Sequence, residues 1–391
     1  MPTNSLLELT KLGQSIWYDN ISRELLDSGE LKRMVEEDGV TGVTSNPTIF
    51  DKAIAGSTAY DAEIRSLLQR GATPHDIYES LVVKDVRTAA DILRPVFDAT
   101  NGVDGYVSLE VSPLLAGNTE ETISQARQLF SLVDRPNLMI KVPATQEGIP
   151  AVEALIGEGI HVNVTLIFSL TSYRQVADAY VRGLAQRRAS GQPLNRVTSV
   201  ASFFVSRVDT VVDARLAQRI AAESDPGRKQ ALKRLFGTAA IANSKMAYRI
   251  FTEIFGRPFD SLHAAGAHKQ RVLWASTSAK NPAYRDVLYV EELIGPHTVN
   301  TMPPATLVAF RDHGIAKPTL ETDVEQAEAN LKALQEAGID LNEVTDELLD
   351  AGVAAFAKSF EELMACITQK QTQFLANREQ GQDGGLGTCA R

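Results

Sequence analysis

The feature that most constrains the fold is a series of eight short apolar runs, separated by longer helical patterns. Continuous runs of β-branched and aromatic residues are typical of strands buried on both faces of a parallel sheet. The predicted strands are Ser15–Asp19, Val40–Thr44, Tyr106–Val111, Leu138–Val142, His161–Phe168, Val197–Phe204, Arg271–Ala275 and Thr298–Met302. They recur about every 40 residues, which leaves room for one helix and two loops between neighbours. The series therefore predicts an α/β fold, a single (β/α)8 TIM barrel with additional helices.

Two of these runs fit the strand pattern less well than the others. Gly42 dilutes the second, and Met302 is followed directly by Pro303 and Pro304 at the end of the eighth. An open doubly wound sheet is the alternative architecture for alternating strands and helices. The number of runs favours the closed barrel.

The chain of 391 residues is long for one barrel, and two helical intervals account for the excess. Residues 51–100 have room for two helices, and residues 207–268 for another pair. We expect residues 1–376 to form one domain and residues 377–391 a disordered tail. Helix starts of the capping-box type are predicted at Asn118 and Thr322. The last helix carries its apolar residues on one face and is expected to pack on the outside of the barrel.

Charge and motifs exclude several classes of function. The chain has 39 Lys and Arg against 49 Asp and Glu, a net charge of −10, so nucleic acid is not an expected partner. The six histidines form no HxH or HExxH pattern, and no GxGxxG or P-loop motif occurs, so we expect no metal and no nucleotide cofactor. Two cysteines are too few for a disulfide framework. No secretory leader or membrane span is recognisable, so the expected location is the cytoplasm, with no membrane partner.

Catalytic groups of such barrels project from the C-terminal ends of the strands. Polar residues end or closely follow nearly every predicted strand. They are Asp19, Thr44, Asn46, Glu110, Lys141, Asn163, Thr165, Ser202, Arg207, Ser276 and Lys280.

Lys141 interrupts an otherwise apolar strand. Burial favours the neutral form of an amine, and a neutral amine is a nucleophile for carbonyl groups. Period-2 alternation places Ser108 and Glu110 on one face of the preceding strand, within reach of Lys141 if that face points into the barrel. Glu110 could then move protons during Schiff-base formation. The alternatives are a lysine whose head reaches water and an inert ion pair between Lys141 and Glu110.

The remaining strand-end residues also have two interpretations each. Asp19 is either an acid–base group or the N-cap of the next helix, and Asn46 either starts a helix or donates to a substrate. Asn163 and Thr165 share a strand face and could hold a water molecule and a substrate hydroxyl.

Two cations follow the sixth and seventh strands. Arg207 and Lys280, beside the hydroxyls of Ser202, Ser276 and Ser278, suit a phosphate group, which barrels often bind with their late loops. Solvated surface charge is the alternative.

Four ordered segments resemble the transaldolases, in the class I aldolase superfamily. They are GVTSNPTIF (Gly42–Phe50), NLMIKVPAT (Asn137–Thr145), GIHVNVTLIFS (Gly159–Ser169) and SFFVSRVD (Ser202–Asp209). QSIWYDNISREL near the start resembles the longer bacterial branch of that family. The resemblance extends from Gln14 to the last helix.

The resemblance implies a role for each matching residue. Lys141 would form a Schiff base with the dihydroxyacetone part of a ketose phosphate. Glu110, with a water held also by Thr165, would move protons, and Asp19 would take the proton from the C4 hydroxyl. The implied substrate-binding residues are Thr44, Asn46, Ser108, Asn163, Ser202, Phe204, Arg207, Ser276 and Lys280. The better-known short branch carries Arg where this chain has Lys280, and the two cations differ in donor geometry.

The implied reaction transfers dihydroxyacetone from sedoheptulose 7-phosphate to glyceraldehyde 3-phosphate, giving erythrose 4-phosphate and fructose 6-phosphate, in the non-oxidative pentose phosphate pathway. It needs no metal or organic cofactor. Its partners would be sugar phosphates, and the expected assembly is a monomer or homodimer. One competitor is a fructose 6-phosphate aldolase, whose relatives carry Tyr where this chain has Phe204. Another is a non-catalytic barrel that only binds sugar phosphates.

Overall fold

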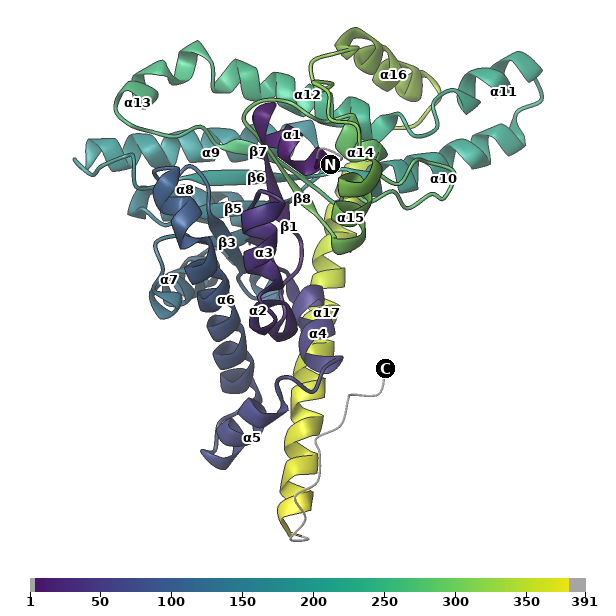
Figure 1. Cartoon of the computed structure of the whole chain (residues 1–391). Coiled ribbons are helices and arrows are strands. Elements are labelled where there is room, and N and C mark those ends of the chain that lie inside the picture. The colour runs from purple at the N-terminus through teal and green to yellow at the C-terminus, as the bar shows by residue number, and fades with distance from the viewer. Residues whose placement is uncertain (1–3, 380–391) are drawn as a thin grey trace.

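The computed structural model describes residues 4–379 and contains a closed barrel of eight parallel strands (Figure 1). The strands are β1 (Gln14–Tyr18), β2 (Val40–Thr44), β3 (Tyr106–Glu110), β4 (Leu138–Pro143), β5 (Val162–Ile167), β6 (Ser199–Phe204), β7 (Arg271–Ala275) and β8 (Thr298–Met302). They pair in sequence order, and β8 closes the barrel against β1. The (β/α)8 fold and all eight predicted strands are confirmed.

The two runs that fit the strand pattern least are strands with the predicted bounds. A Cβ atom on Gly42 would lie 2.4 Å from the ring of Trp17, which fills the barrel next to β2, so a glycine is required there. At the other end of the chain, β8 stops at Met302, and Pro304 is the first residue of the following helix. Proline suits a first helical turn because it has no N–H to leave unpaired.

Helices surround the barrel and account for the length of the chain. The first group is α1 (Ser5–Lys11), α2 (Arg23–Asp27), α3 (Glu30–Glu37), α4 (Pro47–Ala55), α5 (Asp61–Gln69), α6 (Pro74–Ala99), α7 (Thr119–Val133), α8 (Gly148–Glu158) and α9 (Leu170–Ala189). The second is α10 (Ser206–Ala222), α11 (Pro226–Lys233), α12 (Ala239–Ile254), α13 (Asp260–Ala264), α14 (Leu288–Glu291), α15 (Pro304–His313), α16 (Val324–Glu336) and α17 (Leu341–Glu379). Two short 3₁₀ turns, η1 (Pro113–Leu115) and η2 (Arg257–Phe259), complete the chain. Four α-helices, not two, occupy the interval 207–268.

One of the two predicted helix caps is correct. The side chain of Asn118 accepts a hydrogen bond from the backbone N–H of Glu121 at the start of α7. The prediction for Thr322 is wrong, because α16 starts one residue later, after Asp323 at φ +51°, and the Thr322 hydroxyl donates instead to the carbonyl of Thr319. A left-handed residue at this junction changes the direction of the chain in a way that a capping box does not.

The expected position of the last helix is also wrong in part. Helix α17 does not pack only on the outside of the barrel, because it contacts α4, α6, α10 and the strand β5. The hydroxyls of Thr48 and Ser359 join it to α4 at 2.8 Å, and Lys370 forms a buried 2.6 Å ion pair with Asp61 of α5. One end of α17 thus lies beside the C-terminal ends of the strands, while its other end extends past α5 (Figure 1).

Two further predictions concern the end of the chain and membranes. Helix α17 continues to Glu379, so residues 377–379 are helical, and the rest of the predicted tail lies outside the described residues. Among residues 4–379, no helix combines the length and the apolar character needed to span a membrane.

Candidate active site

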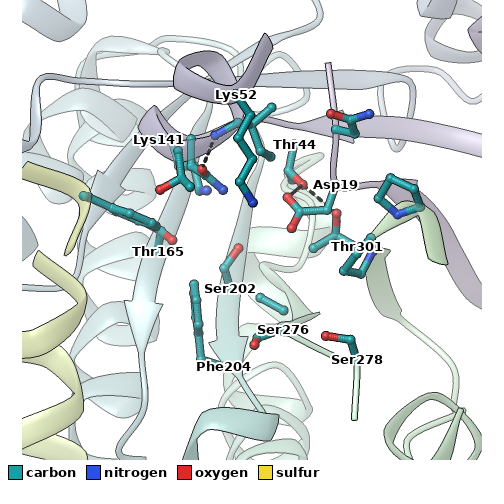
Figure 2. Close-up of a pocket in the computed structure, with 18 of the residues that line it drawn as sticks. Asp19, Thr44, Lys52, Lys141, Thr165, Ser202, Phe204, Ser276, Ser278 and Thr301 are labelled. Atoms are coloured by element: carbon teal, nitrogen blue, oxygen red, sulfur yellow. Dashed lines mark hydrogen bonds between the residues drawn. The ribbon is translucent and has the colours of Figure 1, made fainter. Parts of the chain in front are cut away.

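A cavity of about 520 Å³ opens at the C-terminal ends of the strands (Figure 2). Ten residues that the sequence predicted for the site line it. They are Asp19, Thr44, Asn46, Lys141, Thr165, Ser202, Phe204, Arg207, Ser276 and Lys280. Three further predicted residues, Ser108, Glu110 and Asn163, do not reach its wall. The barrel therefore gathers most of the predicted set around one space.

Lys141 lies deep in this space, on β4, with 4% of its surface exposed. Its Nζ donates a 3.0 Å hydrogen bond to the carbonyl of Ser45 and lies 3.5 Å from Oε2 of Glu110. The two residues are register partners on the adjacent strands β3 and β4. A separation of 3.5 Å is longer than a typical charge-assisted hydrogen bond, so the pair is adjacent without being tightly locked.

Glu110 is buried next to Lys141. Burial raises the pKa of its carboxyl to about 7, and the nearby Lys141 ammonium opposes that rise. Within the described residues, Oε2 of Glu110 has no hydrogen-bond partner. A second, small cavity of about 20 Å³ touches Glu110, which is enough space for one water molecule. A carboxyl with these properties can both give and take a proton near neutral pH.

Asp19 is not the N-cap of the next helix, because Ser22 caps α2. Its carboxylate instead faces the cavity and accepts a 2.7 Å hydrogen bond from the Thr44 hydroxyl. That hydroxyl lies 2.6 Å from the hydroxyl of Thr301, which must therefore be the donor to Thr44. Burial raises the pKa of Asp19, against the opposing effects of Lys141, the Thr44 hydrogen bond and two more distant cations.

The prediction that Asn46 starts a helix is confirmed, and its donation to a substrate stays a prediction. Its side chain caps α4 by accepting a 2.9 Å hydrogen bond from the N–H of Ile49, and it also lines the cavity. The helix cap fixes the orientation of the amide, so its remaining N–H groups are available to a ligand.

A chain of hydrogen bonds lies beneath the floor of the cavity. The amide of Asn163 donates to the Ser108 hydroxyl at 3.0 Å and accepts from the Ser202 hydroxyl at 2.7 Å. Ser108 and Asn163 are fully buried, so they support Ser202 from below. Thr165 reaches the cavity itself, and the part of the chain that the structure describes offers its hydroxyl no hydrogen-bond partner.

Positive charge gathers on one side of the cavity. Arg207, the second residue of α10, is half-buried, and its guanidinium lies 5.2 Å from the centre of the Phe204 ring. Lys280 is exposed and donates a 2.6 Å hydrogen bond to the Ser278 hydroxyl. Burial lowers the pKa of both cations, and for Lys280 the charge of Arg207 adds to that effect. The backbone of Ser276 is left-handed, at φ +56°, and its hydroxyl lies 3.0 Å from that of Ser206.

The sequence predictions missed several lining residues. Lys52 belongs to α4, and Phe356 of α17 places its ring 6.0 Å from Nζ of Lys141. Neither residue ends a strand, so the rule used for the predictions did not include them. Helical spacing offers a signal for Lys52, because Asn46, Ile49 and Lys52 recur every three residues along one side of α4.

The site offers no arrangement suited to a metal ion. Across residues 4–379, no group of three or more His, Cys, Asp or Glu side chains could hold one. The reactive groups that the site does provide are an amine, two carboxyls and several hydroxyls.

Comparison with known proteins gives a consistent result. The family model described as transaldolase/fructose-6-phosphate aldolase matches residues 16–367. A protein of Nostoc punctiforme named transaldolase 2 is 50% identical over 374 residues, 95% of this chain and 98% of the relative. Proteins named transaldolase from Thiobacillus denitrificans and Thermobifida fusca are 50% and 49% identical, each over 93% of this chain and at least 98% of the relative.

Proposed function

The chain belongs to the transaldolase family, and on that premise we propose how its cavity transfers a dihydroxyacetone unit between sugar phosphates. The donor is sedoheptulose 7-phosphate and the acceptor glyceraldehyde 3-phosphate, with erythrose 4-phosphate and fructose 6-phosphate as products. The observation that carries the mechanism is the buried Lys141 amine, 3.5 Å from a buried carboxyl whose pKa is about 7.

The first step joins the substrate to Lys141. The neutral amine attacks the C2 carbonyl of the ketose phosphate, and the resulting carbinolamine loses water to give an iminium ion. Glu110 is suited to these proton transfers because its pKa lies near neutral pH. The unpartnered hydroxyl of Thr165 faces the same space and could hold a water molecule that carries the proton.

The second step breaks the C3–C4 bond. Asp19 takes the proton from the C4 hydroxyl, the C4 carbon leaves as an aldehyde, and the bonding electrons move to C3, where the iminium ion accepts them. The hydroxyls of Thr44 and Thr301 hold Asp19 in position for this transfer. The same carboxyl returns its proton when the acceptor aldehyde adds in the reverse sense.

The phosphate group of each substrate requires a cationic wall. Arg207 and Lys280 line the cavity together with Ser276 and Ser278. We propose that Arg207 binds the phosphate with its planar group and that Lys280 adds a second charge.

The activity can be measured directly with purified sugar phosphates. Incubation with sedoheptulose 7-phosphate and glyceraldehyde 3-phosphate should produce erythrose 4-phosphate and fructose 6-phosphate in equal amounts. No free dihydroxyacetone should accumulate while acceptor is present. Absence of both products would refute the transferase function.

A fructose 6-phosphate aldolase is the second candidate, because the matching family model includes that activity. The aldolase relatives carry Tyr at the position of Phe204, whose ring here packs 5.1 Å from Phe168 and offers no hydroxyl to activate a water. An apolar ring favours retention of the bound three-carbon unit. Release of dihydroxyacetone from fructose 6-phosphate alone, at a rate equal to transfer, would identify the aldolase instead.

We propose further that the reaction needs no metal or organic cofactor, because the iminium ion is itself the electron sink. The partners are small sugar phosphates, and the negative net charge argues against nucleic acid. We place the enzyme in the cytoplasm, because phosphorylated sugars are charged and do not cross membranes unaided. A monomer or homodimer is the proposed assembly.

A further inference from the structure

Lys52 is a cation of the cavity for which the mechanism above has no use. It lies on α4, and its side chain points into the cavity (Figure 2). Its side chain is exposed, and no hydrogen bond or ion pair reaches its ammonium from residues 4–379. Many exposed lysines elsewhere on the molecule pair with a nearby carboxylate, for example Lys84 with Glu63 at 2.8 Å. The charge of Lys52 is therefore available to a ligand.

Like charges are gathered in the cavity to an unusual degree. Lys52, Lys141, Arg207 and Lys280 all line it, and Asp19 is the carboxylate that faces them among the described lining residues. The repulsion acts on Lys280, where burial, Arg207 and Lys52 each lower the pKa against the opposing effect of Asp19. Such a cluster is costly while the cavity is empty and favourable once an anion binds.

The cations lie at different depths. Lys141 is almost fully buried, Arg207 is half-buried, and Lys52 and Lys280 are exposed at the rim. The two rim lysines also come from different elements, since Lys52 extends from α4 and Lys280 from the loop after β7. A phosphate near Arg207 would therefore share the cavity with two exposed cations that come from different elements.

The proposed reaction uses substrates of two lengths, and this inference rests on that reaction. When C2 is fixed to Lys141, the phosphate of sedoheptulose 7-phosphate lies one carbon farther out than that of fructose 6-phosphate. Arg207, half-buried with its guanidinium over the Phe204 ring, cannot follow both positions equally well. We propose that Lys52 is a specificity-determining residue, a rim cation that binds the phosphate of the longer substrates.

Microscopic reversibility gives this inference a quantitative signature. Sedoheptulose 7-phosphate and erythrose 4-phosphate are the two sides of one half-reaction, and they share its transition state. This half-reaction also converts the free enzyme to its dihydroxyacetone adduct, and in the proposed role Lys52 contacts the phosphate and not the bound three-carbon unit, so its replacement should leave the equilibrium of the half-reaction unchanged. Any loss of kcat/KM should therefore be the same factor for both members of this pair. Fructose 6-phosphate and glyceraldehyde 3-phosphate, the shorter pair, form the other half-reaction and can respond independently.

The test is Lys52→Met, which keeps the length of the side chain and removes its charge. We expect kcat/KM to fall about fivefold for both members of the longer pair, as for the loss of one exposed ion pair. For the shorter pair, we expect a fall of less than about twofold. The longer-pair deficit should shrink as salt is added, because a rim charge is screened by solvent ions.

Two further variants separate charge from structure. Lys52→Arg should restore the longer pair, and Lys233→Met, an exposed lysine on α11, should leave both pairs unchanged. An equal loss for both pairs, or no loss for either, would overturn the inference while leaving the transferase function intact. If the wild-type protein transfers nothing, the proposed function fails, and the inference fails with it.

Discussion

Both ends of the barrel contain buried charged groups, but these groups differ in how completely they are hydrogen-bonded. At the N-terminal end, the carboxylate of Asp104 accepts hydrogen bonds from Trp17 at 2.8 Å, from Thr41 at 3.0 Å and from the Ser15 hydroxyl. Arg271 pairs with the same carboxylate at 3.4 Å and donates a 2.6 Å bond to Ser15. Each of these groups thus has a partner within the network.

At the C-terminal end, the charged groups are not matched in this way. Lys141 and Glu110 are 3.5 Å apart, and within residues 4–379 the Glu110 Oε2 and the Thr165 hydroxyl have no hydrogen-bond partner. Satisfied buried groups stabilise a fold, whereas unsatisfied ones are costly to keep and are retained where chemistry requires them. The contrast concerns the charged groups, since the amide oxygens of Gln14, Asn137 and Gln270 at the N-terminal end also lack a partner among the described residues. It assigns stability to the Asp104 network and reactivity to the site around Lys141.

The largest expected effect separates activity from stability at the reactive end. Lys141→Ala removes the only nucleophile that the mechanism uses, so transfer should fall by about 10⁴-fold or more. The free energy of unfolding in urea should change by no more than about 1 kcal/mol, since a charged group is removed from a crowded site. A coupled transfer assay measures the activity, and denaturant unfolding measures the stability. Retained turnover would refute the Schiff-base role.

The matching experiment at the other end is Asp104→Ala. It removes the carboxylate that pairs with the Arg271 guanidinium and the acceptor of the Trp17 N–H, so unfolding free energy should fall by about 3–5 kcal/mol. Michaelis constants measured well below the unfolding temperature should not change. Asp104→Asn, which keeps an acceptor oxygen, should lose less. A variant with normal stability and impaired substrate binding would contradict the division between the two ends.

Glu110→Gln tests the proton-transfer role of the unsatisfied carboxyl. The amide keeps the shape of the side chain but cannot exchange a proton, so kcat should fall by about 10²-fold. Rapid-mixing measurement should place this loss in imine formation. If imine forms at the normal rate, Glu110 serves only as a structural partner of Lys141.

The same carboxyl should make stability depend on pH. Its pKa is about 7 in the folded protein against 4.5 for an unperturbed Glu, so between these values the folded state holds a proton that the unfolded state has lost. Wild-type stability should therefore decline as pH rises through this window. Relative to wild type, Glu110→Gln should gain roughly 2–3 kcal/mol between about pH 4 and pH 8. Parallel stability curves would contradict the raised pKa.

The smallest effect concerns Asn46, which contributes to both stability and the site. Asn46→Ala should cost about 1 kcal/mol of unfolding free energy through the lost helix cap, and transfer should also slow. Asn46→Ser keeps a capping oxygen, so stability should return while activity does not. If serine restores both, the amide has no contact with substrate.

The strands were predictable because burial on both faces leaves little freedom in their composition. Even β2 was found, although Gly42 weakens its pattern, and the reason for that glycine, the Trp17 ring, emerges only in three dimensions. The residues at the strand ends were predictable because neighbouring parallel strands align, which brings register partners such as Glu110 and Lys141 together. Most of the site followed from this single rule.

The features that were missed depend on packing between distant elements. The sequence of α17 has an apolar face, but nothing local indicates that the Phe356 ring lies near Lys141, more than 200 residues earlier in the chain. Lys52 was missed because it lies within a helix, and Asp323 because its left-handed backbone carries no distinctive sequence pattern. Whether a buried charged group is hydrogen-bonded, as Asp104 is and Oε2 of Glu110 is not within the described residues, likewise emerges only in three dimensions.

The claim that the end of the barrel with Lys141 and Glu110 is the reactive end is tested most directly by trapping the covalent intermediate. The protein is incubated with fructose 6-phosphate, reduced with borohydride, digested and analysed by peptide mass. We expect a reduced dihydroxyacetone adduct on Lys141 and none on Lys52 or Lys280. An unmodified Lys141 in a protein that still turns over substrate would contradict it.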